Sequence, residues 1–237
     1  MKMRFIRYLR EEMKAYYLNR RFILIFLLFA LFFLFVFKSG FIKYVLIYFY
    51  SPSQVKSLFV LVYFYSMISF IPFFSLMICY DAVSSQMQNR SLYYVITNIP
   101  RKVYFLGKFV AISLFFVIIN LLAYAVIAIY LVVNGSTSFH GIGLVVFLFL
   151  SLYSTAFVAF FLLISTITRR PALSLVFSII TIGISYIFRV KLGIVSIFSY
   201  VPELVNPSAI ITSSVSLLGF IAVCILAASI YLEVIDL

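Results

Sequence analysis

Residues that carry chemistry are scarce in this sequence. Its 237 residues include six acidic residues, one histidine and two cysteines. Enzymes that work inside a membrane need clustered carboxylates, metal ligands or a serine and a histidine within reach of each other, and the sequence has no HExxH motif and no paired aspartates. We therefore expect no catalysis by this chain, and neither a metal nor a cofactor of its own.

The cysteines and the histidine are isolated from one another in the sequence. Cys79 and Cys224 lie within apolar runs without CxxC spacing, and His140 stands alone beside Gly141. Buried cysteines of this kind usually pack as small apolar side chains. We expect neither a disulfide nor metal ligation from these residues.

Charged side chains are also few, and their scarcity excludes a soluble protein. They make up 10% of the chain, whereas 66% of the residues are hydrophobic and the mean hydropathy is +1.23. A soluble protein of this length could bury a core but would still need a polar coat. Lipid is the solvent that fits this composition.

Six apolar runs divide the chain. Each crossing of a ~30 Å hydrocarbon core takes roughly 20 helical residues. We predict an all-α, polytopic membrane protein with six transmembrane helices in a single transmembrane domain, residues 1–237. The first run is the shortest, and no cleavage site follows it, so we expect it to remain a span. The predicted spans are Phe22–Phe37, Leu58–Tyr80, Phe109–Val133, Ile142–Thr168, Ala172–Phe188 and Ser216–Ile235.

The basic residues predict the orientation of these spans. Lysines and arginines close to span ends are retained on the cytoplasmic side of a membrane. With a cytoplasmic N-terminus, 13 of the 18 basic residues fall in cytoplasmic segments, and the other five are Lys38, Lys43, Lys56, Arg189 and Lys191. We therefore expect a cell (cytoplasmic) membrane protein with both termini in the cytoplasm. The net charge of +12 then meets anionic lipid, and we expect no nucleic-acid partner.

Residues 1–21 are predicted to form an interfacial amphipathic helix before the first span. Apolar and aromatic residues recur at three-to-four spacing, and charged residues occupy the other face. A simple anchor for the first span remains an equally good interpretation. The apolar set is Phe5, Ile6, Leu9, Met13, Tyr16 and Tyr17, and the charged set is Arg4, Arg7, Arg10, Glu11 and Lys14.

Residues 81–108 form the longest polar stretch after the N-terminal segment, and the predicted topology places them in the cytoplasm. We expect Asp81 to cap a short helix that ends at Gln88, and a second helix to begin near Pro100 and run into the third span. A short helix held between two spans can pass force from a soluble partner to the bundle. An ordinary connecting loop is the alternative.

This stretch resembles the cytoplasmic loop of type-2 ABC transporter permeases. In that family an acidic residue after the second span precedes an E-x(3)-G-T-L-type segment, and a G-K pair opens the third span. Asp81 matches the acidic residue, Ser91-Leu92 match the T-L pair, and Gly107-Lys108-Phe109 match the opening of the third span. The departures are Gln86 in place of a usual glutamate and Arg90 in place of the glycine.

The family also has a hydrophobic re-entrant hairpin between its fifth and sixth spans. Residues 190–215 resemble this outer element, because they are mostly apolar and are interrupted by Pro202 and Pro207. Irregular backbone at membrane depth must be packed in protein or line water. An outer loop with an interfacial helix is the alternative.

The resemblance implies the membrane subunit of an ATP-driven ABC transporter, in a family composed mostly of exporters. Such permeases dimerise, with a second copy or a homologous permease, around a central path. Cytoplasmic ABC ATPase subunits drive them. The chain has no GxxxxGK[ST] loop, so ATP and Mg²⁺ are expected on the partner ATPase. The residues expected to couple to the ATPase are Asp81, Ser84, Ser85, Gln86, Gln88, Arg90 and Ser91.

Polar residues within the predicted spans are candidates for lining the path. They are Ser113, Asn120, Ser151, Ser154 and Thr155. Packing between helices, or bonding to the helix backbone, is the competing interpretation for each of them.

Two other functions stay open. An ion-coupled secondary carrier usually keeps ionisable residues at membrane depth, and the six predicted spans contain none away from their ends. A membrane scaffold subunit that transports nothing would share the same composition.

Overall fold

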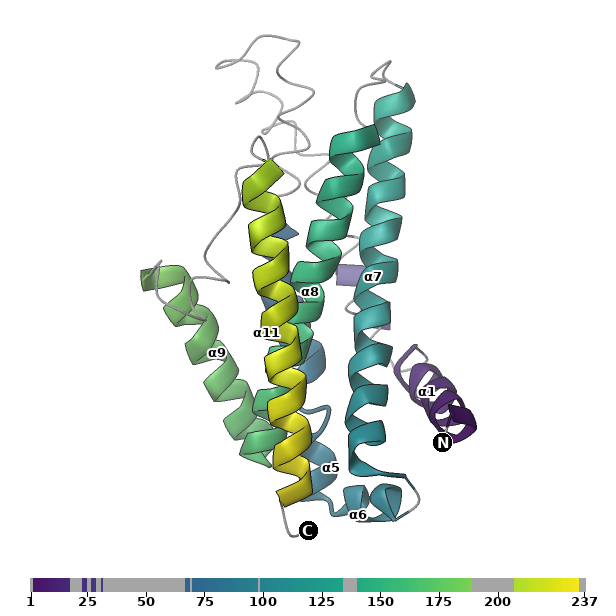
Figure 1. Cartoon of the computed structure of the whole chain (residues 1–237), viewed down its shortest axis with the longest axis vertical. Helices are drawn as coiled ribbons and strands as arrows, with labels where there is room; N and C mark the ends of the chain where they lie inside the picture. Colours follow the sequence, from purple (N-terminus) through teal and green to yellow (C-terminus); the bar gives the residue numbers. More distant parts are fainter. Residues whose placement is uncertain are drawn as a thin grey trace.

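Helices form all the regular structure in the part of the chain that the structure describes. A computed structural model describes residues 2–17, 23–24, 27–28, 31, 67–68, 70–97, 99–133, 140–188 and 207–234 (Figure 1). Residues 67–68 and 70–79, from the second predicted span, are helical. The remaining helices are α1 (Lys2–Tyr17), α5 (Ser84–Gln88), α6 (Ser91–Ile96), α7 (Arg101–Val133), α8 (His140–Thr168), α9 (Pro171–Phe188) and α11 (Pro207–Val234).

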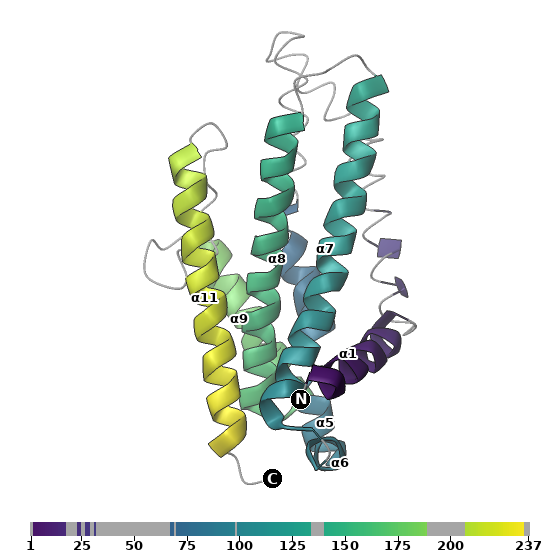
Figure 2. The ribbon, with the colours of Figure 1, turned by 45° about the vertical axis from the view of Figure 1, so that its right-hand side comes forward.

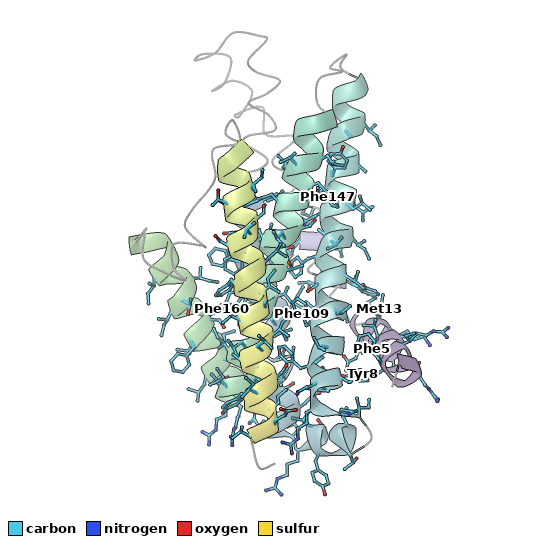
Figure 3. All side chains as sticks on the ribbon, in the orientation of Figure 1. Phe5, Tyr8, Met13, Phe109, Phe147 and Phe160 are labelled. Carbon is cyan, nitrogen blue, oxygen red and sulfur yellow. The ribbon has the colours of Figure 1, made fainter. Side chains whose placement is uncertain are left out.

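Helix α8 is the centre of the bundle. It packs against α7, α9 and α11, while α1 packs along α7 (Figures 1 and 2). Its buried residues recur at helical spacing, among them Phe149, Tyr153, Phe157 and Phe161. Phe160 extends this aromatic core to α11, with its ring centroid 5.8 Å from that of Phe220 (Figure 3).

The outer faces of these helices are apolar. On α7, for example, Leu121, Val126 and Ile129 are each about half exposed or more. Such surface is stable in lipid and would be a liability in water. By length and composition three helices of the described residues can cross a membrane, over Arg101–Val126, Leu144–Thr168 and Ile211–Val234. Helix α9 adds a shorter apolar stretch, Pro171–Ile184.

The predicted third, fourth and fifth spans are helical, and α7 and α11 each begin eight or nine residues before the start of the predicted span, whereas α8 and α9 begin within two residues of it. Helix α7 begins at Arg101, ahead of the predicted span start at Phe109, and the Pro100 carbonyl accepts its first helical hydrogen bond from the Tyr104 amide at 3.0 Å. This confirms a helix that runs from near Pro100 into the third span. Helix α11 begins at Pro207 instead of Ser216, since proline at the first helical position loses no hydrogen bond.

Several predictions fall partly or wholly outside the described residues. Within the first span, 22–37, the structure describes residues 23–24, 27–28 and 31, which are helical. Residues 190–206 of the predicted re-entrant segment lie outside the described residues. Residues 207–215 of that segment are the first turns of α11. Within the predicted amphipathic segment 1–21, residues 2–17 are helical.

The predicted cap of the short loop helix is wrong. Helix α5 ends at Gln88 as expected, but Val83 precedes its first residue and no side chain of that position caps it. Asp81 contributes its carbonyl instead, which accepts the Ser85 amide at 3.2 Å and the Ser85 hydroxyl at 2.5 Å. Helix α6, which follows at once, was not predicted.

Candidate functional site

The α5–α6 segment, residues 81–96, closes one end of the bundle. Figures 1 and 2 show it at the end of the bundle where α11 ends. Helix α5 contacts α8 and α9, and α6 contacts α7. The segment therefore rests on three long helices at once.

Burial divides the residues expected to couple to an ATPase into three groups. Ser84 is completely buried and faces the bundle. Asp81, Ser85 and Gln86 are half-buried. The exposed members are Gln88, Arg90 and Ser91, together with Asn89 and with Tyr93, whose exposed fraction is 56%. The accessible surface of the segment is thus the turn between α5 and α6.

Arg90 shapes this turn through its backbone. Its φ of 54° and ψ of 9° place it in the left-handed region, where a residue with a Cβ loses roughly 1 kcal/mol relative to glycine. The type-2 ABC permease motif that this stretch resembles carries a glycine where this sequence has Arg90. The conformation therefore explains why a glycine suits the motif, and it explains how α6 can start immediately after α5.

Ser165 of α8 holds the other end of α5. Its hydroxyl oxygen accepts the amides of Val83 at 3.2 Å and Ser84 at 3.1 Å, and it donates to the carbonyl of Tyr80 at 3.1 Å. The first amides of a helix have no partner within the helix. Ser165 therefore caps α5 from a different helix, and no local sequence signal marks it for this role.

Replacing Ser165 with alanine should release α5 from α8. Two buried amides lose their acceptor, which costs about 2 kcal/mol. We expect a lower midpoint of thermal unfolding in detergent and faster hydrogen exchange at Val83 and Ser84. Thr168→Ala is the control, because that hydroxyl bonds only the Ile164 carbonyl of its own helix at 2.8 Å. Unchanged exchange at both amides would contradict the assignment.

Tyr104 connects α5 to the first turns of α7. Its hydroxyl donates to Gln86 Oε1 at 2.5 Å, and the side chain is fully buried. The Lys108 ammonium lies 5.3 Å from the centroid of its ring, and the Tyr8 ring centroid lies at 6.2 Å. One aromatic side chain thus contacts α5, α7 and α1.

Lys108 forms a buried ion pair that the sequence did not reveal. Its ammonium lies 3.4 Å from Glu12 Oε2, and the side chains are 2% and 13% exposed. Lys108 lies just before the predicted third span, which begins at Phe109, but two turns inside α7. Glu12 lies on the face of α1 that also carries Tyr8, Leu9 and Met13, and an acid on an apolar face was the available signal.

Arg101 and Lys102 join the start of α7 to the end of α11. The Arg101 guanidinium donates to the carbonyl of Leu232 at 2.6 Å and to that of Glu233 at 3.2 Å. Lys102 pairs with the Glu233 carboxylate at 3.0 Å. Cations at a helix C-terminus satisfy its last carbonyls and complement its dipole.

The residues expected to line a path belong to α7 and α8. Ser113, Asn120, Ser151 and Ser154 are buried, and the Asn120 amide donates to the Ser154 hydroxyl at 3.4 Å. Thr155 is half-buried and bonds the Leu152 carbonyl of its own helix at 2.8 Å. Within the described residues, Ser113 Oγ, Asn120 Oδ1 and Ser151 Oγ have no hydrogen-bond partner.

The described residues contain no group of three His, Cys, Asp and Glu side chains placed to hold a metal ion. Cys79 and Cys224 are both buried free thiols.

Comparison with known proteins adds one finding. A family model described as "ABC-2 family transporter protein" matches residues 8–201. The match covers most of α1 and all of the helices from α5 to α9. No curated protein matches the chain.

Proposed function

Since the chain belongs to the ABC-2 family of transporter proteins, we propose that it is the membrane-spanning permease subunit of an ATP-driven ABC exporter. Two copies, or one copy and a homologous permease, form the translocation path. Cytoplasmic ABC ATPase subunits bind ATP and Mg²⁺ and supply the energy. The chain itself is not catalytic.

The observation that carries this proposal is the fixed yet accessible α5–α6 turn. Its outer residues, Gln88, Arg90 and Ser91, are exposed. Its inner residues are bonded to the bundle, Ser84 next to Ser165 and Gln86 to Tyr104. A partner that moves the outer side of such a turn also moves the helices behind it.

The expected coupling residues then divide into two roles. The exposed residues contact the ATPase, and Tyr93 adds an aromatic side chain of the kind that contributes most to protein interfaces. Ser84 and Gln86 transmit the movement to α8 and α7. Asp81 and Ser85 stabilise the first turn of α5 from the half-buried side.

Charge supports a cytoplasmic position for this end of the bundle. Arg101 and Lys102 reach the end of α11, and Arg169, at the end of α8, lies 5.9 Å from the Tyr231 ring of α11. Two more arginines lie in turns of this region. Arg90 is between α5 and α6, and Arg170 is between α8 and α9. Basic residues gathered at one end favour the cytoplasmic face.

The buried polar groups of α7 and α8 support a path beside these helices. Unpaired polar atoms are costly in lipid, so Ser113, Asn120 and Ser151 are suited to a protein interior and not to a lipid-facing surface. The alternative role for these residues is packing between helices of one copy, and the Asn120–Ser154 hydrogen bond supports that alternative.

Site-specific crosslinking tests the proposal. In a background with Cys79 and Cys224 replaced by alanine, cysteines at Gln88 and Ser91 should crosslink to the ATPase that copurifies in mild detergent. A cysteine at the buried Ser84 is the matched control and should not react. If no ATPase copurifies, or if position 84 crosslinks as strongly as 88, the proposal fails.

A further inference from the structure

One face of α1 is buried against α7. Phe5, Tyr8 and Met13 lie on the side of α1 that meets α7 (Figure 3), whereas Ile6, which the periodicity assigned to the apolar face, is 55% exposed. At the last turn, the Tyr17 ring centroid lies 5.9 Å from that of Phe115. Burial there raises the pKa of the Tyr17 hydroxyl. Helix α1 therefore packs against protein as well as against lipid.

The polar centre of this contact is Glu12. Its Oε1 accepts the Tyr8 hydroxyl at 2.6 Å, and its Oε2 lies 3.4 Å from the Lys108 ammonium. Both carboxylate oxygens are thus engaged. The neighbouring Glu11 points outward, with 64% of its side chain exposed, and pairs only at the surface with Lys14 at 3.6 Å. Two adjacent glutamates therefore have opposite environments.

The contact continues from α1 to α5 without a break. Glu12 holds Lys108 and Tyr8, both of which lie against the Tyr104 ring, and the Tyr104 hydroxyl donates to Gln86. Glu12 and Gln86 belong to segments far apart in the sequence, and two side chains of α7 join them.

We propose that Glu12 is a positioning residue for α5, and that α1 sets the orientation of the α5–α6 segment through Lys108 and Tyr104. In this arrangement α1 is more than a membrane anchor. A displacement of α1, by lipid or by a partner, changes the presentation of Gln88 and Arg90. The consequence for ATPase coupling rests on the proposed function, but the effect on α5 does not.

Pulsed electron paramagnetic resonance on the full chain in lipid nanodiscs tests the proposal without any ATPase. Spin labels at Gln88 and Ile211 report on α5, and labels at Lys14 and Ile211 report on α1. Ile211 is a distant reference point, because it lies about 33 Å along α11 from Glu233, which is bonded to the start of α7, at 1.5 Å per residue. Distances of this size suit the method. Each pair is measured in the parent, Glu12→Gln and Glu11→Gln chains.

Glu12→Gln should broaden both distance distributions by about twofold, because it removes the charged partner of a buried ammonium. Glu11→Gln should match the parent in both. If α1 moves in Glu12→Gln while the Gln88 distribution stays that of the parent, α1 is an anchor only and the proposal is overturned. No change in either distribution overturns it as well.

Tyr104→Phe supplies a test that leaves the ion pair in place. It removes only the hydroxyl that bonds Gln86 and keeps the ring against Lys108 and Tyr8. We expect the Gln88 distribution to broaden and the Lys14 distribution to remain that of the parent. An unchanged Gln88 distribution would overturn the link from α7 to α5. If the chain without these substitutions does not crosslink to an ATPase from positions 88 and 91, the proposed function is refuted, but the distance results for α1 and α5 still hold.

Discussion

Replacing Lys108 with methionine is expected to lower the free energy of unfolding by about 3 kcal/mol. The substitution leaves the Glu12 carboxylate without its cation, and breaking a buried ion pair in this way costs roughly 3–5 kcal/mol. The lower end applies because 13% of the Glu12 side chain remains exposed. The loss is measurable by thermal or denaturant unfolding of the purified chain in one detergent.

A second substitution separates the charge from the packing. Replacing a whole buried ion pair by apolar side chains of similar volume is often neutral, so Glu12→Leu combined with Lys108→Met should recover most of the stability. The matched control is Lys102→Met. That lysine pairs with Glu233 at 3.0 Å, but its side chain is 58% exposed, and an exposed pair contributes at most about 1 kcal/mol. Equal losses from Lys102→Met and Lys108→Met would contradict the buried pair.

Alanine at Gly107 is expected to separate α1 from α7. A Cβ added at this position would lie 2.6 Å from Cε1 and 2.7 Å from Cδ1 of Tyr8. Tyr8 cannot turn aside freely, because its hydroxyl bonds Glu12 and its ring lies against Tyr104. Overpacking of this kind costs about 1–3 kcal/mol. The position of α1 against α7 should therefore be less stable and less populated in this variant.

Limited proteolysis measures this separation directly. Trypsin should cleave after Arg10 and Lys14 several times faster in Gly107→Ala than in the parent chain, since an undocked helix unfolds more readily. Gly183→Ala is the control, because a Cβ there meets no atom within 4 Å. Tyr8→Ala should remove the penalty of the Gly107 substitution, because it removes the ring that the Cβ meets. Equal cleavage rates in all of these chains would show that the close approach has no effect on docking.

The resemblance to type-2 ABC permeases rested on a short motif and is confirmed by the family match over residues 8–201. The structure explains part of that motif. Arg90 takes the left-handed conformation that favours the family's glycine, and this turn produces α6. Sequence periodicity could not predict α6, because the start of this helix depends on the backbone conformation of Arg90, which periodicity does not reveal. Lys108, which the motif placed at the opening of the third span, lies two turns inside α7.

Helix ends were predicted less well than helix positions. Apolar runs in the sequence coincide with α7, α8 and α9. Each apolar residue favours burial in lipid, and a helix forms the backbone hydrogen bonds that lipid cannot supply. The helix start near Pro100 was predicted, but the apolar run begins only at Phe109, because the first turns of α7 carry the charged Arg101 and Lys102. Their charges are satisfied by the end of α11, which is a tertiary contact.

Hydropathy, helical period and motif spacing are local properties, so they were enough to predict a lipid environment, the helical class, the amphipathic α1 and the family. Which polar groups meet depends on tertiary contacts. Ser165 caps α5 from 81 residues away, and Glu12 reaches Lys108 across 96 residues. A serine or a glutamate carries no mark of its distant partner. Packing of the long helices chooses that partner, because a polar group buried among them is stable only where another completes its hydrogen bonds.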